Sequence, residues 1–315
     1  MPKYRNHLPQ LDGKLFLTDG GMETTLIFHD GIDLPFFAAF DLLREKAGTD
    51  KLRNYYELYA SMAKESGMGF VLESPTWRAN SDWAKKLGYS DEALAVANQE
   101  SIKMMEEVRE TFETDQSPMV ISGSIGPRGD GYDPGVIMTP EEAERYHRTQ
   151  INTFVASEAD IVSALTITNT PEAIGLTRAA QKAKIPVVIS FTVETDGRLP
   201  TGQTLKEAIQ VTDAETENGP AYYMINCAHP THFEATLATD EDWVKRIGGL
   251  RANASKCSHA ELNESEELDD GDPQALGREI GAIRKQHDHI NVVGGCCGTD
   301  HRHVEQMSVE VKAAA

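Results

Sequence analysis

Two short apolar runs, Met119-Val120-Ile121-Ser122 and Asp160-Ile161-Val162-Ser163, enclose a longer segment from Pro140 to Ser157 in which apolar residues recur every three or four positions. The short runs have the length and composition of buried strands, whereas the periodic segment is typical of an amphipathic helix. A strand, a helix and a second strand in this order form a βαβ unit, which builds parallel sheets. This stretch therefore predicts an α/β protein.

The same unit recurs along the chain. Helical periodicity also marks Asp50–Ser66 and Asp91–Phe112, while Thr139 and Asp272 each precede a proline, as helix N-caps do. Eight successive parallel strands favour closure into a (β/α)8 TIM barrel over an open sheet. Because no interdomain linker is visible, we expect residues 1–315 to form a single barrel domain. Six further apolar runs that we interpret as strands lie at Lys14–Leu17, Gly69–Leu72, Pro186–Phe191, Tyr222–Ile225, Ile247–Leu250 and His289–Val293.

The composition limits the classes of function. The chain carries 50 acidic and 30 basic residues, a formal charge of −20, which would repel nucleic-acid phosphates and anionic lipid surfaces. No apolar run approaches the length of a membrane span, and Met1–Gly13 lacks the apolar core of a secretory signal. Four cysteines, two of them adjacent, fit a reducing compartment better than a disulfide scaffold. We therefore expect a cytoplasmic protein that binds neither nucleic acid nor membranes.

Three segments between the periodic elements are expected to be loops. Glycine and proline punctuate Gly129–Gly135 and Asp196–Gly202. The segment from Ala254 to Asp272 is rich in acidic residues, and we interpret it as a solvated loop or short helix. Its acidic side chains include Glu261, Glu264, Glu266, Glu267, Asp269 and Asp270.

Three of the four cysteines stand where predicted strands end, on the face where (β/α)8 barrels bind their ligands. Cys227 ends the sixth strand in Asn-Cys-Ala-His-Pro, and Cys296 and Cys297 end the eighth in Gly-Gly-Cys-Cys-Gly. Only one strand separates these two strands around a barrel, so the thiols should meet. Three thiolates with an open fourth position are typical of catalytic zinc, because structural zinc sites normally close with a fourth protein ligand. The alternative is that these are buried core cysteines.

A thiol bound at the open position of such a Zn2+ ion would be deprotonated at neutral pH and remain nucleophilic. This chemistry suits alkyl transfer to sulfur, with the zinc-activated thiolate of the substrate as the reacting group, and we assign no protein general base. Cys257 is expected to be a spectator thiol, and His301 and His303 to lie at the start of a helix. His229 either orients a metal ligand or is structural.

These motifs resemble those of the homocysteine S-methyltransferase family over most of the chain. The resemblance implies that homocysteine, bound to Zn2+ through its sulfur, accepts a methyl group and becomes methionine. It further implies that Asp19, Gly20 and Gly21 contact the amino acid and that Glu73, Trp77 and Arg78 line the pocket. The alternative is that Asp19 and the glycines only shape a turn and that Trp77 only packs. The motifs that carry the resemblance are Thr18-Asp19-Gly20-Gly21-Met22, Arg78-Ala79-Asn80, Gly123-Ser124-Ile125-Gly126-Pro127, Asn226-Cys227 and Gly294-Gly295-Cys296-Cys297-Gly298-Thr299.

One position departs from the family pattern. Family members commonly carry a glutamate at the end of the fourth strand that binds the ammonium group of homocysteine, and this chain has Leu165 there. A leucine cannot pair with an ammonium group, and an unpartnered charge in a partly buried pocket is costly. Either another carboxylate replaces the glutamate, with Glu73 and Glu194 as the nearest candidates, or the acceptor is a different thiol.

Three functions follow from these alternatives. The first is a homocysteine methyltransferase that uses a small onium donor such as S-methylmethionine. The second is a zinc-dependent demethylase with a different thiol acceptor, and the third is a non-catalytic barrel for zinc storage or redox sensing. The sequence leaves open whether a separate corrinoid protein delivers the methyl group, and it does not set the oligomeric state.

Overall fold

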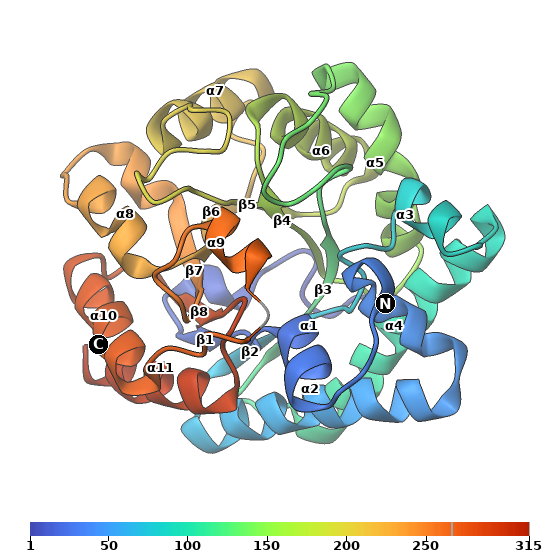
Figure 1. Ribbon diagram of the computed structural model, residues 1–315, viewed down its shortest axis with the longest axis horizontal. Coiled ribbons are helices and arrows are strands. Elements are labelled where there is room, and N and C mark those ends of the chain that lie inside the picture. Colours follow the sequence, from blue (N-terminus) through green and yellow to red (C-terminus); the bar gives the residue numbers. More distant parts are fainter. Residues whose placement is uncertain (266, 315) are drawn as a thin grey trace.

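The computed structural model describes residues 1–265 and 267–314 and contains a closed barrel of parallel strands. Each strand pairs with the next along the chain, and β8 pairs with β1, so that the predicted (β/α)8 barrel is confirmed. Figure 1 looks along the barrel, with the helices arranged in a ring around the strands. The strands are β1 (Phe16–Leu17), β2 (Gly69–Glu73), β3 (Met119–Ile125), β4 (Ile161–Ile167), β5 (Val187–Phe191), β6 (Tyr222–Ala228), β7 (Ile247–Ala252) and β8 (Val292–Gly295).

The helices begin where their capping residues predict. Thr139 accepts a hydrogen bond from the backbone N–H of Glu142, and Asp272 accepts from Gln274, so both predicted N-caps are confirmed. The helices are α1 (Met22–Thr24), α2 (Lys46–Ser66), α3 (Ser81–Lys86), α4 (Asp91–Phe112), α5 (Pro140–Val155), α6 (Thr170–Ala183), α7 (Leu205–Thr216), α8 (Pro230–Leu237), α9 (His259–Glu264), α10 (Pro273–Gln286) and α11 (His301–Ala313). Shorter 3-10 turns span Pro9–Asp12, Pro35–Phe37, Ala39–Arg44 and Asp242–Arg246, and a π-helical turn spans Thr25–His29.

Two apolar layers hold the barrel together, because successive side chains of a strand point to opposite faces. Phe16 joins one cluster and the adjacent Leu17 joins the other. The smaller cluster combines side chains from seven further strand positions with Leu8 of the N-terminal segment. The larger cluster contains most of the buried helix residues. Because apolar side chains fill the barrel, polar chemistry is expected at the end of the barrel where the strands terminate.

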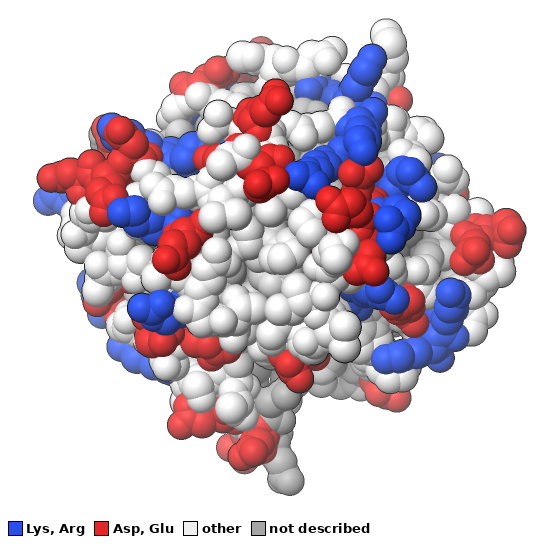
Figure 2. All heavy atoms as spheres, turned by 90° about the horizontal axis from the view of Figure 1, so that it is seen from above, with Lys and Arg blue, Asp and Glu red and all other residues white. Residues whose placement is uncertain are grey.

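The acidic segment after β7 contains a short helix, as the sequence predicts. Ser258 caps α9 through a capping box with Glu261, and Glu266 lies outside the described residues. In Figure 1 this helix lies over the end of the barrel rather than in the outer ring. Acidic and basic side chains are interspersed over the face seen in Figure 2. None of the described helices is both long enough and apolar enough to cross a membrane.

Candidate metal and substrate site

The three predicted metal-binding thiols lie together at the end of the barrel. Their sulfur atoms are all within 4.8 Å of one another, and the Sγ atoms of Cys227 and Cys297 are 3.9 Å apart. Cys227 comes from β6, whereas Cys296 and Cys297 follow β8, and β7 separates the two strands. Hydrogen bonds from the neighbouring thiols lower the pKa of Cys296 well below its usual value and raise the pKa of Cys227. The three thiols therefore influence one another's ionisation.

The backbone that carries Cys227 is strained. Cys227 has a φ of 54° and Thr166 of β4 has a φ of 61°, in the left-handed region that non-glycine residues seldom occupy. Asn226 links them, since its Oδ1 accepts from the Thr166 N–H at 2.8 Å and its Nδ2 donates to the Thr166 Oγ1 at 2.8 Å. Such conformations cost about 1–3 kcal/mol each and cluster at functional sites. The strain aims the Cys227 thiol at the cysteines after β8.

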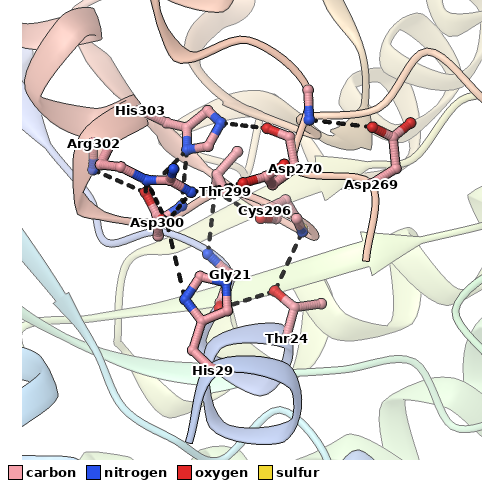
Figure 3. Close-up of polar contacts among 12 residues, drawn as sticks. Gly21, Thr24, His29, Asp269, Asp270, Cys296, Thr299, Asp300, Arg302 and His303 are labelled. Carbon is pink, nitrogen blue, oxygen red and sulfur yellow. Dashed lines mark hydrogen bonds and ion pairs between the residues drawn. The ribbon is translucent and has the colours of Figure 1, made fainter. Parts of the chain in front are cut away.

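The turn that follows β8 is packed tightly against the start of α1. The Gly21 N–H donates to the Thr299 carbonyl oxygen at 2.9 Å, and the Thr299 hydroxyl donates to the Cys296 carbonyl at 2.7 Å (Figure 3). A Cβ atom on Gly21 would lie 2.5 Å from the Cys296 carbonyl oxygen, so only glycine permits this approach. Gly298 adopts a φ of 78° directly after the cysteines. The glycines of both motifs therefore fix the direction of Cys296 and Cys297.

A charged network at the start of α11 connects this turn to the acidic segment. Arg302 pairs with Asp300 and with Asp270, each at 2.7 Å, and His303 Nε2 lies 2.7 Å from the Asp270 carbonyl oxygen. Figure 3 shows these groups beside Thr299 and Cys296. The predicted place of His301 and His303 at a helix start is confirmed. The network anchors the acidic segment at one end beside the thiols.

A cavity of about 350 Å3 opens over the three thiols. Leu262, Leu268 and Asp269 of the acidic segment form part of its wall, so this segment is a cover as well as a solvated loop. Tyr132, in the loop after β3, stacks on His259 of α9, and the ring centroids are 4.0 Å apart. The Tyr132 hydroxyl lies 3.4 Å from the Cys297 sulfur. Two segments from different parts of the chain thus meet above the thiols.

The predicted residues after β1 line the cavity, but Asp19 is already paired. Its Oδ1 accepts from Arg251 Nη2 at 2.7 Å, its Oδ2 accepts from the Tyr55 hydroxyl at 3.1 Å, and its side chain is almost fully buried. Arg251, at the end of β7, also donates to the Gly295 carbonyl oxygen. The Asp19–Arg251 pair therefore joins β1, β7 and β8 behind the cysteines. Gly20 and Gly21 also lie in the cavity wall.

Besides Glu267 and Asp269 of the acidic segment, two carboxyl groups of the barrel line the cavity without an ion pair in the described part of the chain. Glu73, at the end of β2, is 4% exposed, and its Oε2 has no hydrogen-bond partner. Glu23, in α1, also lines the cavity. Burial raises the pKa of both groups from 4.5 to about 7. The negative charges of Cys296 and Asp19 contribute further to the raised pKa of Glu23.

Trp77 and Arg78, which follow β2, also line the cavity. The Trp77 Nε1 donates to the Leu165 carbonyl oxygen at 3.1 Å. The Arg78 guanidinium lies between Trp77 and Trp83, about equally far from each ring at 4.1 and 4.2 Å, and donates to the Gly129 carbonyl oxygen. Leu165 lines the same cavity and is buried. The end of β4 therefore presents an apolar side chain to the substrate space.

The remaining predicted residues lie outside this cavity. Glu194 is absent from its wall and instead pairs with His259 at 3.2 Å. His229 caps α8 by accepting from the Thr231 N–H, and burial lowers its pKa to about 4, which supports the structural reading. Cys257 is exposed and does not belong to the thiol group, as expected for a spectator.

Three residues of the site escaped sequence reasoning. Arg251 could have been found, because it follows the apolar run at Ile247–Leu250 and therefore ends a strand on the ligand-binding face. Glu23 is only two residues beyond Gly21, but nothing in the pattern showed that it faces inward. Tyr132 lies in a loop whose path has no periodic signal.

Comparisons with known proteins agree on one family. The family model described as homocysteine S-methyltransferase matches residues 16–311. The chain is 25% identical to selenocysteine Se-methyltransferase from Brassica oleracea var. italica, over 91% of this chain and 86% of that protein. It is 23% identical to homocysteine S-methyltransferase 4 from Zea mays, over 96% of this chain and 91% of that protein.

Solved structures show the same fold. The homocysteine methyltransferase MmuM from Escherichia coli superposes in its oxidized form with a TM-score of 0.75 and 17% identity, over 98% of this chain and 99% of that chain. Its metallated form gives a TM-score of 0.71 at 16% identity, over 94% and 96%. The family predicted from the sequence, and with it a methyltransferase acting on homocysteine, is confirmed. This chain belongs to the homocysteine S-methyltransferase family.

Proposed function

We propose that the chain methylates homocysteine to methionine from a small onium donor such as S-methylmethionine, with Zn2+ held by Cys227, Cys296 and Cys297. The observation that carries the proposal is the convergence of three thiols, from two strands, on one cavity in a barrel of this family. The proposed role is methionine biosynthesis. Free cysteines also support the cytoplasm as its place.

The thiols fit a zinc ion. A tetrahedral site with Zn–S bonds of about 2.3 Å separates its sulfur atoms by about 3.8 Å. The distance between the Cys227 and Cys297 sulfur atoms is 3.9 Å, and Cys296 lies within the same 4.8 Å group. Zn2+ bound there would lower the pKa of a substrate thiol, so that sulfur could accept a methyl group at neutral pH.

The protein's own residues orient the reactants. The Asp19–Arg251 pair and the packed glycines hold the cysteine turn in place before a ligand arrives. The cover formed by the acidic segment and Tyr132 narrows access of water to the thiols. With these residues in place, the reaction requires that the two substrates are oriented and that the substrate sulfur is ionised. We assign no protein general base.

Aromatic side chains at the mouth of the cavity support an onium donor. Phe28 and Phe37 line the cavity and are 43% and 48% exposed, so part of each ring is open to a ligand. Aromatic faces attract quaternary ammonium and related cations. These two rings lie on the segment between α1 and α2. A cationic methyl donor would therefore enter over them and meet the acceptor below.

The test combines metal content with product formation. Protein purified under reducing conditions should contain about one zinc per chain, as a single three-thiolate site requires, and should convert homocysteine and S-methylmethionine to methionine. Zinc without methionine would shift the proposal to a different thiol acceptor, which the apolar Leu165 favours. A panel of thiols analysed by mass spectrometry would identify that acceptor. A protein that binds no zinc after reconstitution would contradict the proposal.

A further inference from the structure

The cavity carries more negative groups than its cations can pair. Asp19 pairs with Arg251 at 2.7 Å, and Asp130 lies 3.7 Å from Arg78. Among the described residues, neither an ion pair nor a side-chain hydrogen bond with a cation engages Glu23 or the Oε2 of Glu73. Both groups line the cavity that contains the thiols. Glu267 and Asp269 of the wall belong to the acidic segment that covers the cavity, so Glu23 and Glu73 are the carboxyl groups of the barrel itself that have no cationic partner among the described residues.

The position of Glu23 relates it to the thiols. Glu23 is two residues beyond Gly21, whose backbone packs on the Cys296 carbonyl oxygen. The proximity of Cys296 contributes to the raised pKa of Glu23. Only two methylene groups separate the sulfur of homocysteine from the carbon that bears its amino group. A homocysteine whose sulfur lies at the three cysteines therefore has its ammonium group within the same part of the cavity.

The opposite wall offers no partner for this ammonium group. Leu165 and Thr166 of β4 line the cavity and neither carries a carboxylate, and the Leu165 carbonyl oxygen already accepts from Trp77. Glu194, the other candidate from the sequence, pairs with His259 outside the wall. An ammonium group left without a carboxylate here would retain its full desolvation cost. Outside the acidic segment that covers the cavity, the carboxylates left for this role are Glu23 of α1 and Glu73 of β2.

We propose that Glu23, assisted by the unpaired oxygen of Glu73, binds the ammonium group of the amino-acid substrate and takes the place of a carboxylate at position 165. This assignment rests on the proposed function. The chain would hold its amino-acid specificity on the short helix α1, directly beside the glycines that position the cysteine turn. Leu165 then packs on the aliphatic part of the substrate.

The experiment compares homocysteine with 4-mercaptobutyrate, which is identical except that it lacks the amino group. In Glu23→Gln, kcat/KM for homocysteine should fall by roughly 30-fold, the loss expected when one partner of a buried charge pair is removed. The value for 4-mercaptobutyrate should stay within about twofold, because that thiol makes no such pair. Glu194→Gln is the matched comparison and should leave the ratio between the two thiols as in the wild type.

Two further measurements separate recognition from folding. The double variant E23Q/L165E should regain a preference for homocysteine, because it restores a carboxylate to the other wall. Calorimetry with the zinc-loaded protein measures homocysteine binding independently of methyl transfer.

The outcomes distinguish this inference from the proposed function. Equal losses for both thiols in Glu23→Gln would make Glu23 structural and overturn the assignment, as would an unchanged preference for homocysteine. Binding of homocysteine that depends on Glu23, without formation of methionine, would support the ammonium site and contradict the proposed reaction. A wild type that binds 4-mercaptobutyrate as tightly as homocysteine would overturn the ammonium site while leaving thiol methylation in place.

Discussion

The two sides of the cavity differ in how far their polar groups are already paired within the protein. Around the cysteine turn, Gly21, Thr299 and Arg251 satisfy the neighbouring carbonyl oxygens, and Asp19 is neutralised. Near α1 and β2, Glu23 and Glu73 lack such partners. The difference teaches that the cysteine side is organised before any ligand arrives, whereas the carboxylate side needs a ligand to complete it.

Removal of a thiol should damage the organised side most. Cys297→Ser should lose bound zinc and lower methyl transfer by at least about 1,000-fold, because a metal contributes several kcal/mol to such reactions. Metal analysis and a methionine assay measure both effects. Cys257→Ser is the control, since that thiol is exposed and outside the group. Full zinc content in Cys297→Ser would show that the metal is held elsewhere.

Unpairing Asp19 should destabilise the framework behind the cysteines. Arg251→Met should lower the free energy of unfolding by about 3–5 kcal/mol, because it leaves a buried carboxylate without its cation. The double variant D19N/R251M should lose less, since neither charge remains. Urea unfolding curves measure both values. Equal losses in the two variants would mean that Arg251 stabilises the fold through its contacts with carbonyl oxygens instead.

The carboxylate side should respond to pH in the opposite sense from an ordinary salt bridge. Burial raises the pKa of Glu73 from 4.5 to about 7, so the folded state binds more protons between these values. The stabilisation from protonated Glu73 is fully present below pH 4.5 and is lost as the pH rises through about 7.

Glu73→Gln keeps a neutral side chain and should therefore gain stability over the wild type as the pH rises. At roughly 1.4 kcal/mol per pKa unit, the gain approaches about 3 kcal/mol at pH 8. Unfolding free energies at pH 5 and pH 8 test it. A difference that does not change with pH would show that Glu73 ionises normally.

The smallest effect is expected where the two sides meet. Tyr132→Phe removes the hydroxyl 3.4 Å from the Cys297 sulfur and should lower kcat/KM by about fivefold, the value of one hydrogen bond, with zinc content unchanged. Steady-state kinetics and metal analysis measure the two quantities. Tyr89→Phe is a control because its hydroxyl donates to the distant Asp41. An unaltered kcat/KM would assign Tyr132 to packing against His259 alone.

The same division explains how much the sequence could predict. The strands were visible because buried runs are short and apolar, and Cys227 and Cys296 could be brought together because a barrel places all strand ends on one face. Arg251 also lies at the end of a strand, so the same rule could have placed it in the site. The framework of the site is therefore encoded in local patterns combined with one topological rule.

Residues of the loops could not be placed in this way. Tyr132 reaches the thiols because its loop folds back and stacks on His259, a contact between segments far apart in the chain. Glu194 follows β5 and was expected near the substrate, but its N–H donates to the Arg198 carbonyl oxygen in a turn that lies outside the cavity wall. The direction of a loop side chain depends on such tertiary contacts, which have no periodic signal.

The left-handed backbone at Cys227 restricts how the proposed zinc site of this barrel can be redesigned. Any substitute at this position must adopt a φ near 54°, and among residues that bind metals, aspartate and histidine enter that region more readily than most. Either would replace a soft sulfur ligand by a harder oxygen or nitrogen, which favours different ions. Cys296 and Cys297 do not have a positive φ. Position 227 is therefore the one of the three at which the main chain most limits the choice of a substitute ligand.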